Sequence, residues 1–133
     1  MTTIIDKIAW IHIVDGKVLC ARSKGKDIYY FPGGKRETGE SDIDTLTREI
    51  QEELSVLIKH ETILHFGNFK AEAHGKEAGV VVRMSCYTGE YDGLISPASE
   101  IDEVAWLTYN DRDRVSVVSQ MIFDRLYEMK MLK

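Results

Sequence analysis

The sequence predicts one domain of the α+β class, spanning residues 1–133, in which a mixed β-sheet packs between helices. Three observations support this. The length of 133 residues is typical of one domain. A hydrophobic fraction of 44% and a charged fraction of 29% are ordinary for a globular chain. Along the chain, patterns typical of strands and helices follow the order strands, helix, strands, helix.

The chain begins with a pattern typical of a β-hairpin. Residues 4–14 alternate loosely between apolar and polar side chains and predict a strand. Asp15-Gly16 supplies a two-residue turn, and residues 17–22 predict the returning strand.

A glycine-rich segment follows. Residues 28–31 predict a short aromatic strand that ends at Pro32-Gly33-Gly34. Because glycine has no side chain, this segment can bend sharply and bring backbone groups close to a ligand.

A helix is predicted from Ser41 to about Ser55. Ser41 is a favourable N-cap, and Asp44 three residues later makes a weaker relative of the capping box. At 100° per residue, the apolar side chains fall within an arc of about 80°, which predicts packing against a core. They are Ile43, Leu46, Ile50, Leu54 and Leu57.

The second half predicts three more strands and a final helix. Residues 62–73 and 79–87 are rich in apolar and β-branched side chains, and a short strand is expected around residues 104–107. Asn110 or Asp111 is predicted to cap the last helix, whose apolar side chains recur every three or four residues. They are Val115, Val118, Ile122, Leu126 and Met129.

Charge and cysteine content restrict the class of protein. With 17 Lys and Arg against 22 Asp and Glu, the net charge of −5 argues against binding of long nucleic acids. No apolar run approaches the roughly 20 residues of a membrane span, and the N-terminus lacks the layout of a signal peptide. We therefore expect a cytoplasmic protein without membrane association. Cys20 and Cys86 predict buried free thiols, and the histidines lack zinc-type spacing.

Three glutamates mark the first helix. Glu49, Glu52 and Glu53 are spaced i, i+3, i+4 and share an arc of about 100° beside the apolar stripe. Taken alone, such a cluster is most often a solvated acidic face. Hard oxygen ligands in this arrangement also suit Mg²⁺ or Mn²⁺.

An arginine precedes these glutamates. The side chains of Arg48 and Glu49 diverge by about 100° around the helix, so they are not helix-face neighbours. Arg48 can instead reach a carboxylate by bending across the loop, either Glu40, Glu37 or Glu49 itself.

The joint spacing of these residues resembles the signature of the Nudix hydrolases, G-x5-E-x7-R-E-U-x-E-E-x-G-U, where U is aliphatic. Chance agreement at all six fixed positions before the last glycine is on the order of 10⁻⁷. The matching residues are Gly34, Glu40, Arg48, Glu49, Glu52 and Glu53. Ser55 replaces the last glycine of the signature, which affects the turn after the helix and not the carboxylates. The strand pattern and the segments YYFPGGK and EIDEVAWL extend the resemblance over residues 4–130.

The resemblance implies a fold and a site. The fold is an α/β/α sandwich, and the activity is hydrolysis of a nucleoside diphosphate linked to another group, with Mg²⁺ as cofactor and Mn²⁺ as an alternative. The implied metal ligands are Glu49, Glu52, Glu53 and the carbonyl of Gly33. Arg48 and Glu40 are implied to orient these carboxylates.

The proton acceptor is left open by the resemblance. One of the signature glutamates, or a carboxylate from a later loop, takes the proton of the attacking water. Glu100 is the candidate from a later loop, with an ordinary loop acid as the equal alternative.

Several residues are candidates for binding substrate. Arg22 and Lys35 could add positive charge for the outer phosphates, or simply be surface cations. Tyr30 could stack on a base, as could other aromatic residues that more often belong to a core. These are Trp10, Tyr29, Phe31 and Phe69. His74 lies in a polar loop that could approach the substrate.

The expected substrate is a small-molecule nucleotide. Because 133 residues leave no room for an added domain, a nucleoside triphosphate is favoured, giving a nucleoside monophosphate and pyrophosphate. Nucleoside diphosphate sugars and dinucleoside polyphosphates are alternatives. A non-catalytic nucleotide-binding module is disfavoured because every signature glutamate is present. Small enzymes of the family are often homodimers, which is compatible with this sequence.

Overall fold

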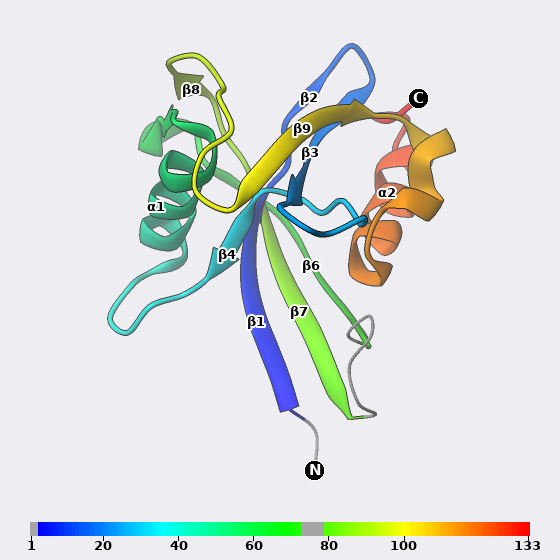
Figure 1. Cartoon of the computed structure of the whole chain (residues 1–133), viewed down its shortest axis with the longest axis horizontal. Helices are drawn as coiled ribbons and strands as arrows, with labels where there is room; N and C mark the ends of the chain where they lie inside the picture. Colours follow the sequence, from blue (N-terminus) through cyan, green and yellow to red (C-terminus); the bar gives the residue numbers. More distant parts are fainter. Residues whose placement is uncertain (1–2, 73–78) are drawn as a thin grey trace.

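The computed structural model describes residues 3–72 and 79–133 and contains nine strands, two α-helices and two 3₁₀ helices within them (Figure 1). The strands are β1 (Thr3–Trp10), β2 (Ile13–Val14), β3 (Lys17–Ser23), β4 (Gly33–Lys35), β5 (Leu57–Ile58), β6 (Leu64–Glu72), β7 (Val80–Thr88), β8 (Tyr91–Asp92) and β9 (Ile101–Leu107). The helices are α1 (Asp42–Leu54), η1 (His60–Thr62), η2 (Tyr109–Arg114) and α2 (Val117–Glu128).

The central sheet has the order β4-β1-β7-β6 and is mixed. Strand β1 runs parallel to β7 and antiparallel to β4, while β6 and β7 are antiparallel. A second sheet has the order β2-β3-β9, and β5 pairs with β8. The predicted mixed sheet is confirmed.

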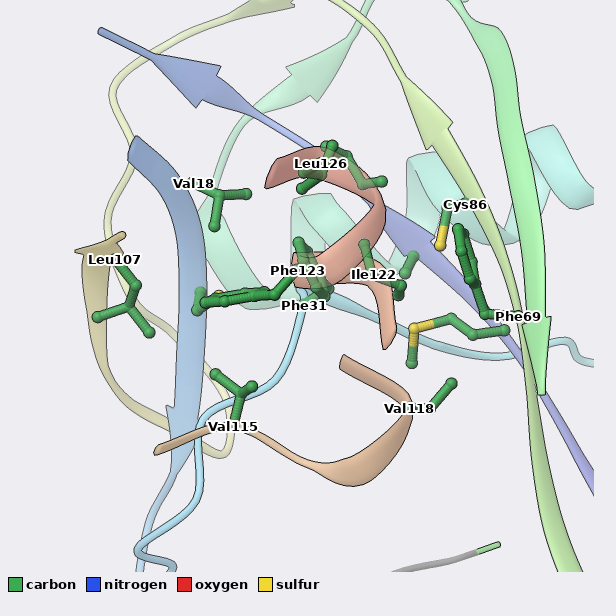
Figure 2. Close-up of a cluster of buried hydrophobic side chains, with 14 of the residues drawn as sticks. Val18, Phe31, Phe69, Cys86, Leu107, Val115, Val118, Ile122, Phe123 and Leu126 are labelled. Carbon is green, nitrogen blue, oxygen red and sulfur yellow. The ribbon is translucent and has the colours of Figure 1, made fainter. Parts of the chain in front are cut away.

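The two α-helices pack on opposite sides of the strands (Figure 1). The alternation of side chains along β1 shows this, because Ile8 and Trp10 belong to the core under α1 and Ala9 belongs to the core under α2. Figure 2 shows the second core, where Phe31 meets Phe123 of α2 edge to face with ring centroids 5.8 Å apart. The predicted α/β/α sandwich is confirmed.

Helix α1 begins as predicted and ends one turn short of the predicted stripe. Ser41 Oγ accepts the Asp44 N–H at 3.1 Å, and the Asp44 carboxylate accepts the Ser41 N–H at 3.2 Å. Three stripe residues are fully buried: Leu46, Ile50 and Leu54. The prediction was wrong for Ile43 and Leu57, which are 38% and 49% exposed. Leu57 lies in β5 because the helix ends at Leu54.

The strand predicted at residues 28–31 is wrong, since only isolated bridges form at Tyr29 and Tyr30. The strand here is β4, in the segment expected to be a loop. Gly33 has a φ of +147°, and a Cβ built on it would lie 2.0 Å from the Ile8 carbonyl oxygen. Only glycine allows the backbone of β4 to approach β1 this closely.

The predicted cap of the last helix is also wrong. Asp111 accepts the Thr108 N–H at 2.9 Å and thereby caps η2, whereas α2 begins at Val117 after Ser116. Val115 is buried ahead of the helix, and Met129, at its C-cap, is 52% exposed.

Three strand boundaries differ from prediction. The strand expected over residues 4–14 is interrupted after Trp10, β6 begins at Leu64 after the η1 turn, and β9 already begins at Ile101. Cys20 and Cys86 are buried free thiols, as predicted. No helix within the described residues is long and apolar enough to cross a membrane.

Candidate active site

Two glutamates of α1 face the glycines of β4. The Gly33 N–H donates to Glu53 Oε1 at 3.0 Å. A Cβ built on Gly34 would lie 2.4 Å from the Glu49 Cδ. Gly33 is therefore required for the close approach of β4 to β1, whereas a side chain at Gly34 would displace the Glu49 carboxylate.

The glutamates differ in burial and hence in acidity. Glu53 is 2% exposed, whereas the side chain of Glu52 is 52% exposed. Burial, together with the nearby carboxylates of Glu49 and Glu100, raises the pKa of Glu53 to about 8 against the opposing hydrogen bond from the Gly33 N–H. Burial also raises the pKa of Glu49, against the effect of Arg48. Carboxylates crowded in this way favour a bound cation.

Arg48 holds the site together from the solvent side. Its Nε and Nη2 donate to both oxygens of Glu40, at 2.7 and 2.9 Å. Its Nη1 donates to Glu49 at 2.9 Å and to Glu52 at 3.4 Å. Arg48 thus bends back across the loop and reaches all three carboxylates that the sequence offered as alternatives, Glu37, Glu40 and Glu49. It thereby links Glu40 to the acidic face of α1.

Glu40 in turn fixes the loop before the helix. Hydrogen bonds from Arg48 lower the pKa of Glu40 to about 2, and the Glu37 N–H contributes at 2.9 Å. The hydroxyl of buried Thr45 also donates to Glu40 at 3.1 Å. Sequence reasoning missed Thr45, although a hydroxyl inside the acidic helix was a visible signal.

Glu100 and Tyr30 both lie within electrostatic range of the glutamates of α1. The electrostatic effects of Glu53, Glu100 and Glu49 add to burial in raising the pKa of Tyr30 to about 12. The Tyr30 and Ser23 hydroxyls are hydrogen-bonded to each other. The sequence separates these residues widely, so their convergence depends on the sheet.

A cavity of about 290 Å³ adjoins the acidic site. It is lined by Tyr30, Gly33, Gly34 and Lys35 and by apolar residues that include Phe31 and Met84. A mainly apolar lining with a few polar groups is typical of a small-molecule site.

Other predicted substrate contacts lie elsewhere. The Arg22 guanidinium pairs with Asp102 at 2.8 Å and Glu103 at 3.4 Å on β9. Trp10 is fully buried, and Phe69 is 8% exposed, so both belong to the cores. His74 lies outside the described residues.

The donors present suit a hard divalent cation. Glutamate oxygens on one helix face, together with a backbone carbonyl of β4, are the ligand types that Mg²⁺ and Mn²⁺ prefer. Within residues 3–72 and 79–133, no three His, Cys, Asp or Glu side chains converge as a ready-made metal site. Arg48 currently engages Glu49 and Glu52, so binding would require their carboxylates to turn toward the ion.

The α/β/α sandwich carries an acidic helix packed against a strand of glycines. Comparison of the chain with models of known protein families identifies the class of protein that has these features. The NUDIX domain model matches residues 7–121. The chain therefore belongs to the Nudix family and is a hydrolase acting on pyrophosphate bonds. No curated protein matches the chain.

Solved structures share the fold at low sequence identity. The E. coli ORF135 protein has a TM-score of 0.76 at 20% identity, over 97% of this chain and 92% of that one. The MutT protein from Bacillus halodurans has a TM-score of 0.69 at 22% identity, covering 90% and 79%. A bifunctional NMN adenylyltransferase/ADP-ribose pyrophosphatase from Francisella tularensis, complexed with AMP and a Mn ion, has a TM-score of 0.68 at 21% identity, covering 96% and 42%.

Proposed function

We propose that this chain is a Mg²⁺-dependent pyrophosphohydrolase that converts a nucleoside triphosphate to a nucleoside monophosphate and pyrophosphate, with Mn²⁺ as an alternative ion. The observation that carries the proposal is the burial of Glu53 against Gly33, beside Glu49 and Glu100. A structural role does not call for a buried carboxylate among others of the same charge.

The residues have separate roles in this proposal. Glu49, Glu52, Glu53 and the Gly33 carbonyl hold the ion. A divalent cation held there supplies positive charge to the phosphoryl oxygens and lowers the pKa of a bound water. Glu100 accepts the proton of the attacking water.

The remaining groups orient and bind. Arg48 and Glu40 orient the carboxylates of α1. The hydrogen bonds of Arg48 to Glu40 and to Glu49 support this role. The cavity takes the nucleoside, with Tyr30 at its wall and Lys35 beside the phosphates. Arg22 contributes charge to the outer phosphates only if its bonds to Asp102 and Glu103 open. We expect a single domain that acts in the cytoplasm on small nucleotides, as a monomer or homodimer.

A substrate screen tests the proposal. The protein is incubated with Mg²⁺ and nucleoside triphosphates, nucleoside diphosphate sugars, ADP-ribose or dinucleoside polyphosphates, and the products are separated by ion-exchange chromatography. We expect alkaline activity giving nucleoside monophosphate and pyrophosphate. Cleavage of nucleotide sugars or dinucleoside polyphosphates alone would reassign the substrate, and ligand-induced stabilisation without turnover would indicate a binding module.

Glu53→Gln tests the site itself. We expect kcat to fall by several orders of magnitude, because the substitution removes a charged oxygen but keeps the acceptor for the Gly33 N–H. Glu128→Gln, at an exposed position of α2, is the matched control and should retain activity. Full activity in both Glu53→Gln and Glu52→Gln would refute the metal assignment.

A further inference from the structure

Ser55 occupies a backbone conformation that disfavours serine. It is the C-cap of α1, with φ 65° and ψ 23°, in the left-handed region. The family signature has glycine here, which adopts this region without steric cost. The chain therefore keeps a less suitable residue at the end of its acidic helix, immediately after Glu53 and Leu54.

The hydroxyl of Ser55 makes a bond that glycine cannot make. Ser55 Oγ donates to the Ser96 carbonyl at 3.1 Å. Two backbone bonds run beside it, from the Ser96 N–H to the Leu54 carbonyl and from the Ala98 N–H to the Glu53 carbonyl, both 2.9 Å. The loop after β8 is thus attached to the end of α1 at three points, of which one depends on a side chain.

That loop leads to the acidic site. Ser99 has a positive φ of 55°, and Glu100 follows it directly. The Glu100 carbonyl accepts the Lys24 N–H at 2.8 Å, which fixes the far end of the loop. The Glu100 carboxylate then lies within electrostatic range of Glu49 and Glu53.

We propose that Ser55 is a positioning residue, whose hydrogen bond to Ser96 holds the loop so that Glu100 faces the glutamates of α1. The proposal rests on the proposed function, since it assumes that Glu100 acts in the reaction. Serine in place of the signature glycine then improves the alignment of Glu100, but it leaves the end of α1 in a strained backbone conformation.

Three substitutions separate the hydroxyl from the backbone strain. Ser55→Gly removes both, Ser55→Ala removes only the hydroxyl, and Ser55→Asn tolerates the left-handed region and restores a donor. We expect kcat to fall about fivefold in Ser55→Gly and Ser55→Ala alike, the effect of losing one ordinary hydrogen bond, with KM unchanged. Thermal unfolding should show Ser55→Gly as the more stable of the two. Ser55→Asn should recover most of kcat.

A double-substitution cycle tests the route through Glu100. If Ser55 acts through Glu100, Ser55→Gly should cost nothing further in the Glu100→Gln background. Full activity in Ser55→Gly, or equal losses in both backgrounds, would overturn the inference. Metal-dependent hydrolysis by the unmodified chain, lost in Glu53→Gln, would still uphold the proposed function in that case.

Discussion

At the scale of single residues, Glu53 combines features that rarely occur together. It is 2% exposed, accepts a backbone N–H, and lies beside Glu49 and Glu100, which add to the effect of burial on its pKa. Arg48 donates hydrogen bonds to Glu49 and Glu52, so its positive charge stabilises those two carboxylates more than that of Glu53. Glu53 should consequently destabilise the metal-free protein.

The pH dependence of stability tests this. The pKa of Glu53 is raised from 4.5 to about 8, so the folded protein binds this proton more tightly than the unfolded chain. Stability of the metal-free protein is therefore lost as pH rises from about 4.5 to 8. At about 1.4 kcal/mol per pKa unit, the upper limit of the loss is about 5 kcal/mol.

The Glu53→Gln variant has an amide that does not titrate, so its stability should lack this dependence on pH. In EDTA, we expect the variant to unfold at nearly the same temperature as the unmodified chain at pH 5, and at a clearly higher temperature at pH 9. Scanning calorimetry of both proteins across this range is the measurement. A difference in Tm that does not change with pH would contradict the assigned acidity.

At the scale of elements, β4 joins the sheet to the acidic helix through two glycines, and a side chain at each would meet a different kind of neighbour. A Cβ at Gly33 would meet the backbone of Ile8, which cannot move without displacing β1. A Cβ at Gly34 would instead meet the end of the Glu49 side chain, which can rotate away. A substitution at Gly33 should therefore reduce stability, whereas a substitution at Gly34 should reduce activity.

Alanine substitutions distinguish the two glycines. Gly33→Ala should destabilise the fold by about 3 kcal/mol or more, through overpacking and a positive φ. Gly34→Ala should remain folded but lose activity at least tenfold, since it displaces Glu49. Gly25→Ala, whose Cβ would have no neighbour within 4 Å, should cost only about 1 kcal/mol. Urea unfolding and steady-state kinetics provide the readouts, and a folded, fully active Gly33→Ala would show that β4 is not held this closely.

At the scale of the whole molecule, the sequence predicted what depends on local spacing and missed what depends on distant backbone contacts. Helix α1, its capping box and the shared face of its candidate site residues follow from the period of one helix. Strand β4 could not be found, because its three residues pair only through a glycine conformation that β1 imposes. The start of α2 was misjudged because Asp111 caps a 3₁₀ helix in front of it.

The site shows the same division. The signature grouped Arg48 with Glu40, Glu49 and Glu52 without any knowledge of the sheet, and Arg48 donates hydrogen bonds to all three. Glu100 entered only as one of two equal alternatives, and the convergence of Tyr30 and Glu100 became visible only once β3 and β9 were paired.

Ion binding should stabilise the whole chain. A cation that binds only the folded state at one hundred times its Kd contributes about 2.7 kcal/mol. Because protons compete for Glu53, we expect Mg²⁺ to raise Tm little at pH 6 and strongly at pH 9, with EDTA reversing the effect. Glu53→Gln should respond weakly at both pH values. An equal Mg²⁺ response in the two proteins would place the ion elsewhere.

In the proposed function, the two layers of the sandwich have different roles, one in the reaction and one in substrate recognition. The acidic residues come from α1 and its loops, while Phe31, Met84 and Val118, which line the adjoining cavity, belong to the core under α2. The glycines of β4 lie between the two, because Gly33 and Gly34 contact glutamates of α1 and also line the cavity. Under the proposed function, substitutions in the α2 layer should alter which nucleotide is accepted while leaving Glu49, Glu53 and Arg48 in place, so redesign of one face alone should change the choice of substrate.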